Sequence, residues 1–132
     1  MIIRYAAATS VLALATAMPA FAEMNFNRIA SFATVANMAE GEDTTRETSA
    51  EIIAATADGM TLIYTDSPLG VVGRIDITDP ANPAPLGNVA LDGEPTAVAV
   101  IGATAFIGVN TSESYTAPSG KIVAMDIASG EI

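Results

Sequence analysis

The chain of 132 residues contains no cysteine and no histidine. Without cysteine, no disulfide framework can form, so stability depends on a packed core. The two absences together exclude a Ser-His-Asp triad, a cysteine nucleophile and the usual zinc sites. The sequence also lacks a Gly-x-Ser-x-Gly elbow, a phosphate-binding loop and a Gly-x-Gly-x-x-Gly turn. No catalytic residue is therefore assigned within this chain.

Basic residues are few, and one of the five lies in an N-terminal leader. Residues 1–22 have the three regions of a cleaved secretory signal: Arg4, an apolar run over 5–17, and small residues before Glu23. The alternative is a membrane anchor, but the apolar run is shorter than the ~20 residues needed to cross a bilayer. We expect a periplasmic or extracellular protein that begins at Glu23, with no membrane insertion after signal cleavage.

The remaining residues 23–132 are strongly acidic. Four basic residues stand against 15 acidic ones, which gives a net charge of −11. Such a surface repels phosphate backbones and anionic membranes, so nucleic acid is not an expected partner. The length suits one small domain.

Period-two alternation and turn residues dominate this part of the sequence, and a helical period is hard to find. The sequence therefore predicts an all-β fold. The expected strands are 26–35, a hairpin over 51–66 hinged at Asp58-Gly59, 71–78, 88–93, and a hairpin over 96–110 hinged near Gly102-Ala103. Residues 121–132 are expected to form a strand, a turn at Ser129-Gly130 and the first residues of a further element. The expected connections are 37–50, 67–70, 111–120 and 79–87, whose three prolines exclude a central strand.

The two halves of this region resemble one another. Segments beginning at Glu47 and Glu94 align at an offset of 47 residues, Leu62 aligns with Phe106 at 44, and Asp76 with Asp126 at 50. Periods of ~40–50 residues with several short strands are typical of propeller blades. The sequence predicts about two β-propeller-like blades.

The motifs in these repeats resemble those of known families. The stretch LIYTDSPLGVVGRIDITDPANPAPLG (62–87) resembles the LVIVD-type propeller repeat, and AFIGVN (105–110) with GKIVAMDIASGEI (120–132) resembles the YVTN-type repeat of surface-layer propellers. The order AEIIAATADGMTLIYTDS (50–67) is similar to the opening blade of choice-of-anchor I proteins and of proteins with an esterase-like-activity-of-phytase domain. The resemblance implies a phytase-like or esterase-like secreted protein, or a surface-layer-like adhesion module.

Two blades cannot close a ring, because closed propellers have about four to eight. We therefore expect residues 23–132 to be the N-terminal part of a longer protein. On this interpretation the partners are the remaining blades or domains, or a protein or carbohydrate ligand, and any catalytic residues follow residue 132. The isolated segment is expected to self-associate or to fold poorly.

An acidic segment supplies the candidate metal ligands. Glu40, Glu42, Thr44 and Glu51 have the spacing of positions 1, 3, 5 and 12 of a calcium loop, with Asp43 between them. The loop lacks the glycine expected at position 6, where Thr45 stands. Two readings remain open: a calcium site, and a solvated acidic loop in which Glu47 or Glu51 pairs with Arg46.

Asp76 and Asp126 recur at equivalent repeat positions. They could line a channel or bind a cation, but short acidic side chains at a strand end commonly accept N–H bonds from the following turn. We expect this structural role. The polar loop 111–120, with Glu113 and Tyr115, is read as a blade connection, with a sugar or peptide surface as the alternative. Residues 110–112 match a glycosylation sequon.

Overall fold

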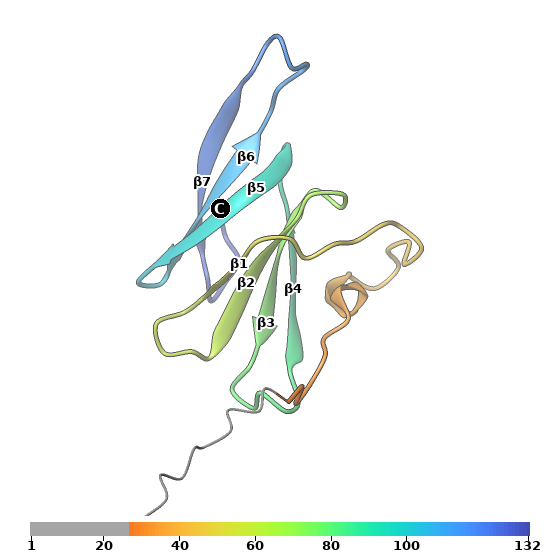
Figure 1. Cartoon of the computed structure of the whole chain (residues 1–132), viewed down its shortest axis with the longest axis vertical. Coiled ribbons are helices and arrows are strands. Elements are labelled where there is room, and N and C mark those ends of the chain that lie inside the picture. Colours follow the sequence, from red (N-terminus) through yellow and green to blue (C-terminus); the bar gives the residue numbers. More distant parts are fainter. Residues whose placement is uncertain (1–26) are drawn as a thin grey trace, which may run out of the picture.

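A computed structural model describes residues 27–132, so the expected signal over 1–22 lies outside the described residues. The described part is all-β apart from one short 3-10 helix. Figure 1 shows its elements, which are η1 (Thr34–Asn37), β1 (Ile53–Ala55), β2 (Thr61–Asp66), β3 (Val71–Asp76), β4 (Ala84–Ala90), β5 (Glu94–Ile101), β6 (Thr104–Asn110) and β7 (Gly120–Asp126).

The strands form two antiparallel sheets in which each strand pairs with the next one along the chain. Sheet A has the order β1-β2-β3-β4, and sheet B has the order β5-β6-β7. Both expected hairpins are confirmed. Ile101 pairs with Thr104 across a two-residue turn, and Gly102 has the positive φ of 59° that favours glycine there. The chain is therefore a succession of local hairpins.

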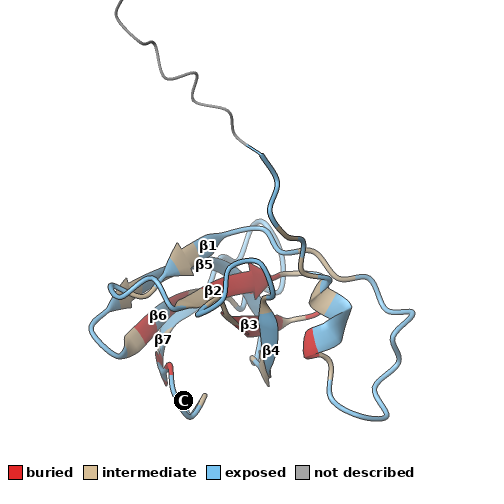
Figure 2. Cartoon of the chain, turned by 90° about the horizontal axis from the view of Figure 1, so that it is seen from below, coloured by how far each residue is buried: buried red, intermediate tan, exposed pale blue. Residues whose placement is uncertain are grey.

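Sheet A is the middle layer of three, because its two faces pack against different parts of the chain. One face carries Ile63 and Val72, which pack with Ile107 and Met125 of sheet B in the main hydrophobic core. The other face carries Tyr64, whose hydroxyl contacts Asn37 of η1. Figure 2 shows η1 on the side of sheet A away from sheet B. Adjacent residues Ile63 and Tyr64 are accordingly both fully buried.

Sheets A and B repeat the same meander in the same register. Thr61 pairs with Asp76 at one end of β2 and β3, and Thr104 pairs with Asp126 at the same end of β6 and β7. The offset of 50 residues between the two aspartates is confirmed. Thr61 and Thr104 are 43 residues apart, so Leu62 corresponds to Ala105 rather than to Phe106. The expected offset of 44 was thus wrong by one residue. A shift of one residue places each side chain of the aligned strand on the opposite face of the sheet.

The first strand of sheet A, β1, and the first strand of sheet B, β5, correspond at a third offset. Ile53 faces Tyr64, and Val98 faces the corresponding Ile107, which makes Ile53 and Val98 equivalent at 45 residues. The expected alignment of Glu47 with Glu94, at an offset of 47, was therefore wrong by two residues. The hairpin between β1 and β2 is longer than the Gly102-Ala103 turn, and this difference in turn length shifts the apparent period.

The strand expected over 26–35 is wrong within the described residues. Residues 27–33 form no ladder, and η1 follows at 34–37. Ile29 and Phe32 instead line an apolar pocket of about 280 Å³ with Leu62 and Ile75 of sheet A. The alternating pattern that suggested a strand therefore serves an extended segment that packs on a sheet face. We call residues 27–50 the N-terminal segment.

The N-terminal segment is anchored by one buried side chain. Asn37 donates through Nδ2 to the Tyr64 hydroxyl and to the carbonyl of Arg74, at 2.9 Å each, and its Oδ1 accepts from the Gly87 amide at 3.0 Å. The Tyr64 hydroxyl donates to Asn88 Oδ1 at 3.2 Å. Burial raises the pKa of Tyr64, so the phenol stays protonated and keeps this donor.

β4 begins earlier than the sequence indicated. The strand was expected over 88–93, but it runs from Ala84 and includes Pro85, which pairs with Ile75. β4 is an edge strand, and such strands tolerate a proline because the missing donor faces no further strand. The exclusion of 79–87 from a central strand is consistent with this position.

Candidate functional site

The acidic segment does not gather its carboxylates in the structure. The Glu42 carboxylate accepts from the Ala39 amide at 2.7 Å, and Asp43 accepts from the amide and hydroxyl of Thr45 at 2.9 and 2.6 Å. Glu51 lies at the C-terminal end of the acidic segment, and its carboxylate accepts from the Ser67 hydroxyl at 2.6 Å. Glu40 is exposed to solvent. Among residues 27–132, no three acidic side chains form a group suited to a metal ion.

The structure does not pair Arg46 with Glu47 or Glu51, as one of the two readings suggested. Arg46 Nη2 donates to the carbonyl of Leu69 at 3.3 Å. Over the described residues, the one ion pair joins Lys121 to Asp92 at 3.2 Å. The acidic segment therefore presents its carboxylates to solvent on the outer side of the N-terminal segment. Calcium binding stays a prediction.

Asp76 and Asp126 have the structural role expected for them. Asp76 Oδ1 accepts from the Thr78 amide at 2.8 Å, and Asp126 Oδ1 accepts from the Ser129 amide at 2.8 Å and its hydroxyl at 2.9 Å. The bonds from the Thr78 side chain and amide lower the pKa of Asp76, and those from the Ser129 amide and hydroxyl lower the pKa of Asp126. The repeated aspartate fixes the turn that follows the third strand of each sheet.

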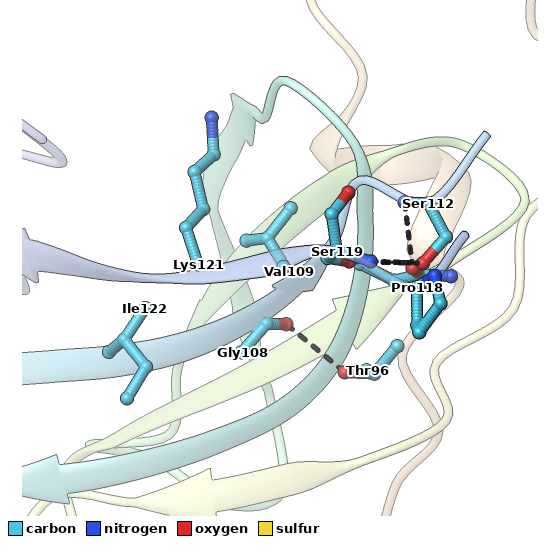
Figure 3. Close-up of a pocket in the computed structure, with 10 residues that line it drawn as sticks. Thr96, Gly108, Val109, Ser112, Pro118, Ser119, Lys121 and Ile122 are labelled. Atoms are coloured by element: carbon cyan, nitrogen blue, oxygen red, sulfur yellow. Dashed lines mark hydrogen bonds between the residues drawn. The ribbon is translucent and has the colours of Figure 1, made fainter.

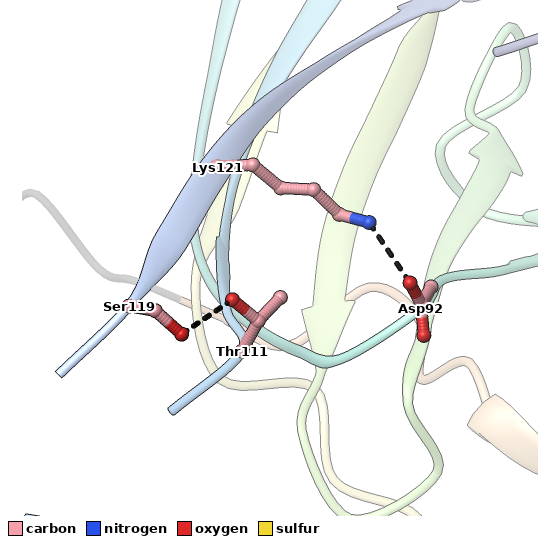
Figure 4. A network of polar contacts seen from close by, with 4 residues as sticks. All are labelled: Asp92, Thr111, Ser119 and Lys121. Atoms are coloured by element: carbon pink, nitrogen blue, oxygen red, sulfur yellow. Dashed lines mark hydrogen bonds and ion pairs between the residues drawn. The ribbon is translucent and has the colours of Figure 1, made fainter. Parts of the chain in front are cut away.

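The polar loop after β6 forms a small hydrogen-bonded unit at one end of sheet B. Ser112 Oγ donates to the Ser119 carbonyl at 3.0 Å and accepts from the Ser119 amide at 2.8 Å. Thr111 and Ser119 hydroxyls lie 2.9 Å apart, and the Lys121–Asp92 ion pair lies beside them (Figure 4). Most of these hydroxyls are engaged within the loop, which favours the expected role as a connection. Tyr115 stays fully exposed at its tip.

A shallow hollow of about 670 Å³ lies between this loop and the outer side of sheet B. Thr96, Gly108, Pro118 and Ile122 are among the residues that line it (Figure 3). Thr96 Oγ1 donates to the Gly108 carbonyl at 3.3 Å at its floor. Ser112, Ser119 and Lys121 also line the hollow; Ser112 bonds to the Ser119 backbone, and Lys121 pairs with Asp92.

Sequence reasoning missed the most distinctive surface, which is the side of sheet B turned away from sheet A. We call the apolar centre of this side the outer face; it consists of Ala97, Ala99, Ile101, Phe106, Gly108, Ile122 and Ala124. None of these seven is charged, and Ile101 and Ile122 are 70% and 76% exposed. Charged Asp126 and Glu94 lie at opposite ends of the same side. The signal was in the sequence, because residues 97–101 contain no polar residue, as in strands buried on both faces.

The outer face corresponds to the face through which sheet A packs on sheet B. By the register of the two meanders, Ile63 is equivalent to Phe106 and Val72 to Ile122. Ile63 and Val72 are fully buried between the sheets, whereas Phe106 and Ile122 face solvent. The repeat unit thus uses this face in sheet A and leaves it open in sheet B.

The described residues contain no helix of sufficient length and apolarity to cross a membrane. The net charge of −11 after the expected signal does not favour an anionic partner for the open surfaces. No protein-family model, no curated protein and no solved structure matches the chain.

Proposed function

We propose that the chain is an exported binding and scaffold segment built from propeller-type repeats. The observation that carries this proposal is the common register of the two meanders, with sheet A stacked on sheet B through a face that sheet B leaves open. Stacked repeats of one supersecondary unit bury their apolar faces on their neighbours. The chain acts, on this proposal, by offering an apolar sheet face to a neighbour.

The larger protein that such a segment would serve is a phytase-like or esterase-like secreted protein. This part of the proposal rests on the resemblance of residues 50–87 and 105–132 to repeats of such proteins. The catalytic residues would lie beyond residue 132. Asp76 and Asp126 support a binding role for this chain and a catalytic role for later residues, because both carboxylates accept hydrogen bonds from the turns that follow them.

The second candidate is a surface-layer-like adhesion or interaction module without catalysis. It is favoured by the apolar outer face together with the exposed Tyr115 at the tip of a hydrogen-bonded loop. Its partners would be a protein or a carbohydrate, and the acidic surface disfavours nucleic acid.

Two measurements test the proposed function. The mass of the product exported to the periplasm or medium should correspond to a chain that begins at Glu23, and retention of residues 1–22 would contradict export by a cleaved signal. The transcript read past the codon for Ile132 should continue with repeats of ~40–50 residues. Clustered histidine, aspartate and arginine further downstream would favour the enzyme, whereas repeats followed by an anchor would favour adhesion.

A further inference from the structure

The loop between β6 and β7 borders a groove that the proposed stacking of repeats does not use. Two hollows, of about 390 and 520 Å³, meet at Glu94, Asn110 and Ser112. Together they run between residues 92–94 and residues 110–118, and we call them the loop groove. Figure 1 shows that this loop projects beyond the rest of sheet B. We propose that the loop groove binds a neutral saccharide chain.

Tyr115 supplies the apolar surface of the loop groove. Its side chain is fully exposed, whereas tyrosine rings are more often partly buried. It lies at the tip of a turn in which Ser114 pairs with Ala117, and the Ala117 amide donates to the Ser114 carbonyl at 3.2 Å. A pyranose ring presents C–H groups on its faces, and the face of an aromatic ring carries partial negative charge, so the two surfaces attract one another. The turn therefore presents the Tyr115 ring as a platform for one sugar ring.

Planar polar side chains lie beside Tyr115 in the loop groove. Asn110 Nδ2 donates to Glu94 Oε2 at 3.2 Å, and Asn110 Oδ1 accepts from the Ser112 amide at 3.0 Å. The Glu94 carboxylate still has lone pairs for further donors. Glu113 is exposed and takes part in no ion pair within residues 27–132. Both carboxylates are thus suited to accept hydrogen bonds from the hydroxyl groups of a saccharide.

The far end of the loop groove adds donors, and this distinguishes a saccharide from a cationic ligand. Thr111 and Ser114 each form one hydroxyl–hydroxyl bond inside the loop and have capacity for more. Lys121 lies beside this end, where it bonds to Asp92 at 3.2 Å (Figure 4). A sugar hydroxyl both donates and accepts, which matches such a mixed surface, whereas a lysine-rich peptide only donates and is repelled by Lys121.

Charge and size narrow the class of saccharide. The net charge of −11 after the expected signal repels anionic polysaccharides, so the chain that binds is neutral. Each hollow has the size of a small-molecule site, and because they meet at Asn110, an oligosaccharide would extend from one into the other. The groove is open to solvent and encloses little of its ligand, so we expect a dissociation constant on the order of 1 mM. This inference rests on the second candidate function, adhesion, and names its ligand.

Tyrosine fluorescence of the exported chain measures binding in the loop groove. After residue 22 the chain contains two tyrosines, Tyr64 and Tyr115, and no tryptophan, and Tyr64 is fully buried. The neutral probes are cellohexaose and chitohexaose, and the charged comparisons are hexagalacturonate and trilysine. At least one neutral probe should change the emission in a saturable way, with little dependence on salt. Neither charged probe should bind as tightly.

Two variants of Tyr115 isolate the aromatic contact, and calorimetric titration measures both because they lack the reporter. Tyr115→Ala should weaken binding at least about tenfold, whereas Tyr115→Phe keeps the ring and should stay within about threefold of the parent chain. Both should fold, since the side chain is fully exposed. Ile122→Ala is the matched control: Ile122 is also exposed on sheet B but lies outside the loop groove, so binding should be unchanged. Melting temperatures establish that all three variants are folded.

Three outcomes overturn the proposal. The first is that neither neutral probe binds at about 10 mM. The second is that Tyr115→Ala leaves binding unchanged, or that Ile122→Ala weakens it as much, which would place the site elsewhere. The third is that trilysine binds more tightly than both hexasaccharides and is released by salt, which would show a site for cationic peptides. None of these results bears on signal cleavage or on repeats beyond Ile132, so they leave the proposed function to its own tests.

Discussion

Replacement of Asn37 tests whether one buried amide holds the N-terminal segment on sheet A. Asn37→Ala removes three hydrogen bonds at once and leaves the Gly87 amide and the Arg74 carbonyl without a partner. An unpaired buried polar group costs ~1–3 kcal/mol, so we expect a loss on the order of 3–5 kcal/mol. That is a large part of the ~5–15 kcal/mol by which small proteins are stable.

A milder variant keeps the test informative if Asn37→Ala does not fold. Tyr64→Phe keeps the ring and removes only the hydroxyl, which bonds to Asn37 and Asn88; about 1–2 kcal/mol is expected. Because the two residues share a hydrogen bond, the double variant should lose less than the sum of the single losses. Asn82→Ala is the control, since that amide bonds to Asp79 at the surface.

Urea unfolding followed by far-ultraviolet circular dichroism measures these losses, and limited proteolysis within residues 38–50 reports release of the N-terminal segment. Asn37→Ala should be cleaved there faster than the parent chain. The reasoning is refuted if Asn37→Ala is no less stable than Asn82→Ala, or if its cleavage rate in this segment is unchanged.

Three further predictions concern a glycine, two aspartates and the acidic segment. Gly73→Ala should prevent folding or cost more than about 3 kcal/mol, because the new methyl group would enter the ring of Tyr64; a normal urea midpoint would contradict this. The lowered pKa values of Asp76 and Asp126 mean that their stabilisation is present above the ordinary aspartate value of 3.8 and is lost as the pH falls through the lower folded values. The urea midpoint should therefore fall on acidification below about pH 4, and less steeply in Asp126→Asn. If residues 40–51 bind calcium, about 1 mM calcium should raise the melting temperature, and no shift would refute that site.

Local rules in the sequence predicted the local parts of the fold. Asp58-Gly59 and Gly102-Ala103 mark the two hairpins because tight turns require glycine's positive φ. Asp76 and Asp126 were recognised as turn residues because their hydrogen bonds reach only two or three positions along the chain.

What the sequence did not predict depends on contacts between distant residues. Asn37 acts on groups 27 to 50 residues away, and no spacing rule identifies such partners. The alternation of residues 27–33 has the same period whether a segment joins a ladder or lies on a sheet face. The outer face was missed because apolar strands suggest burial but do not reveal which side a neighbour covers.

The N-terminal segment over Tyr64 also limits how far an assembly of this chain can grow. The layers follow the order segment, sheet A, sheet B. The segment closes one end with an acidic layer that contains no strand, whereas the outer face of sheet B is open at the other end. Further sheets can therefore stack at one end only, and loss of the segment would expose the Tyr64 face and permit stacking at both ends.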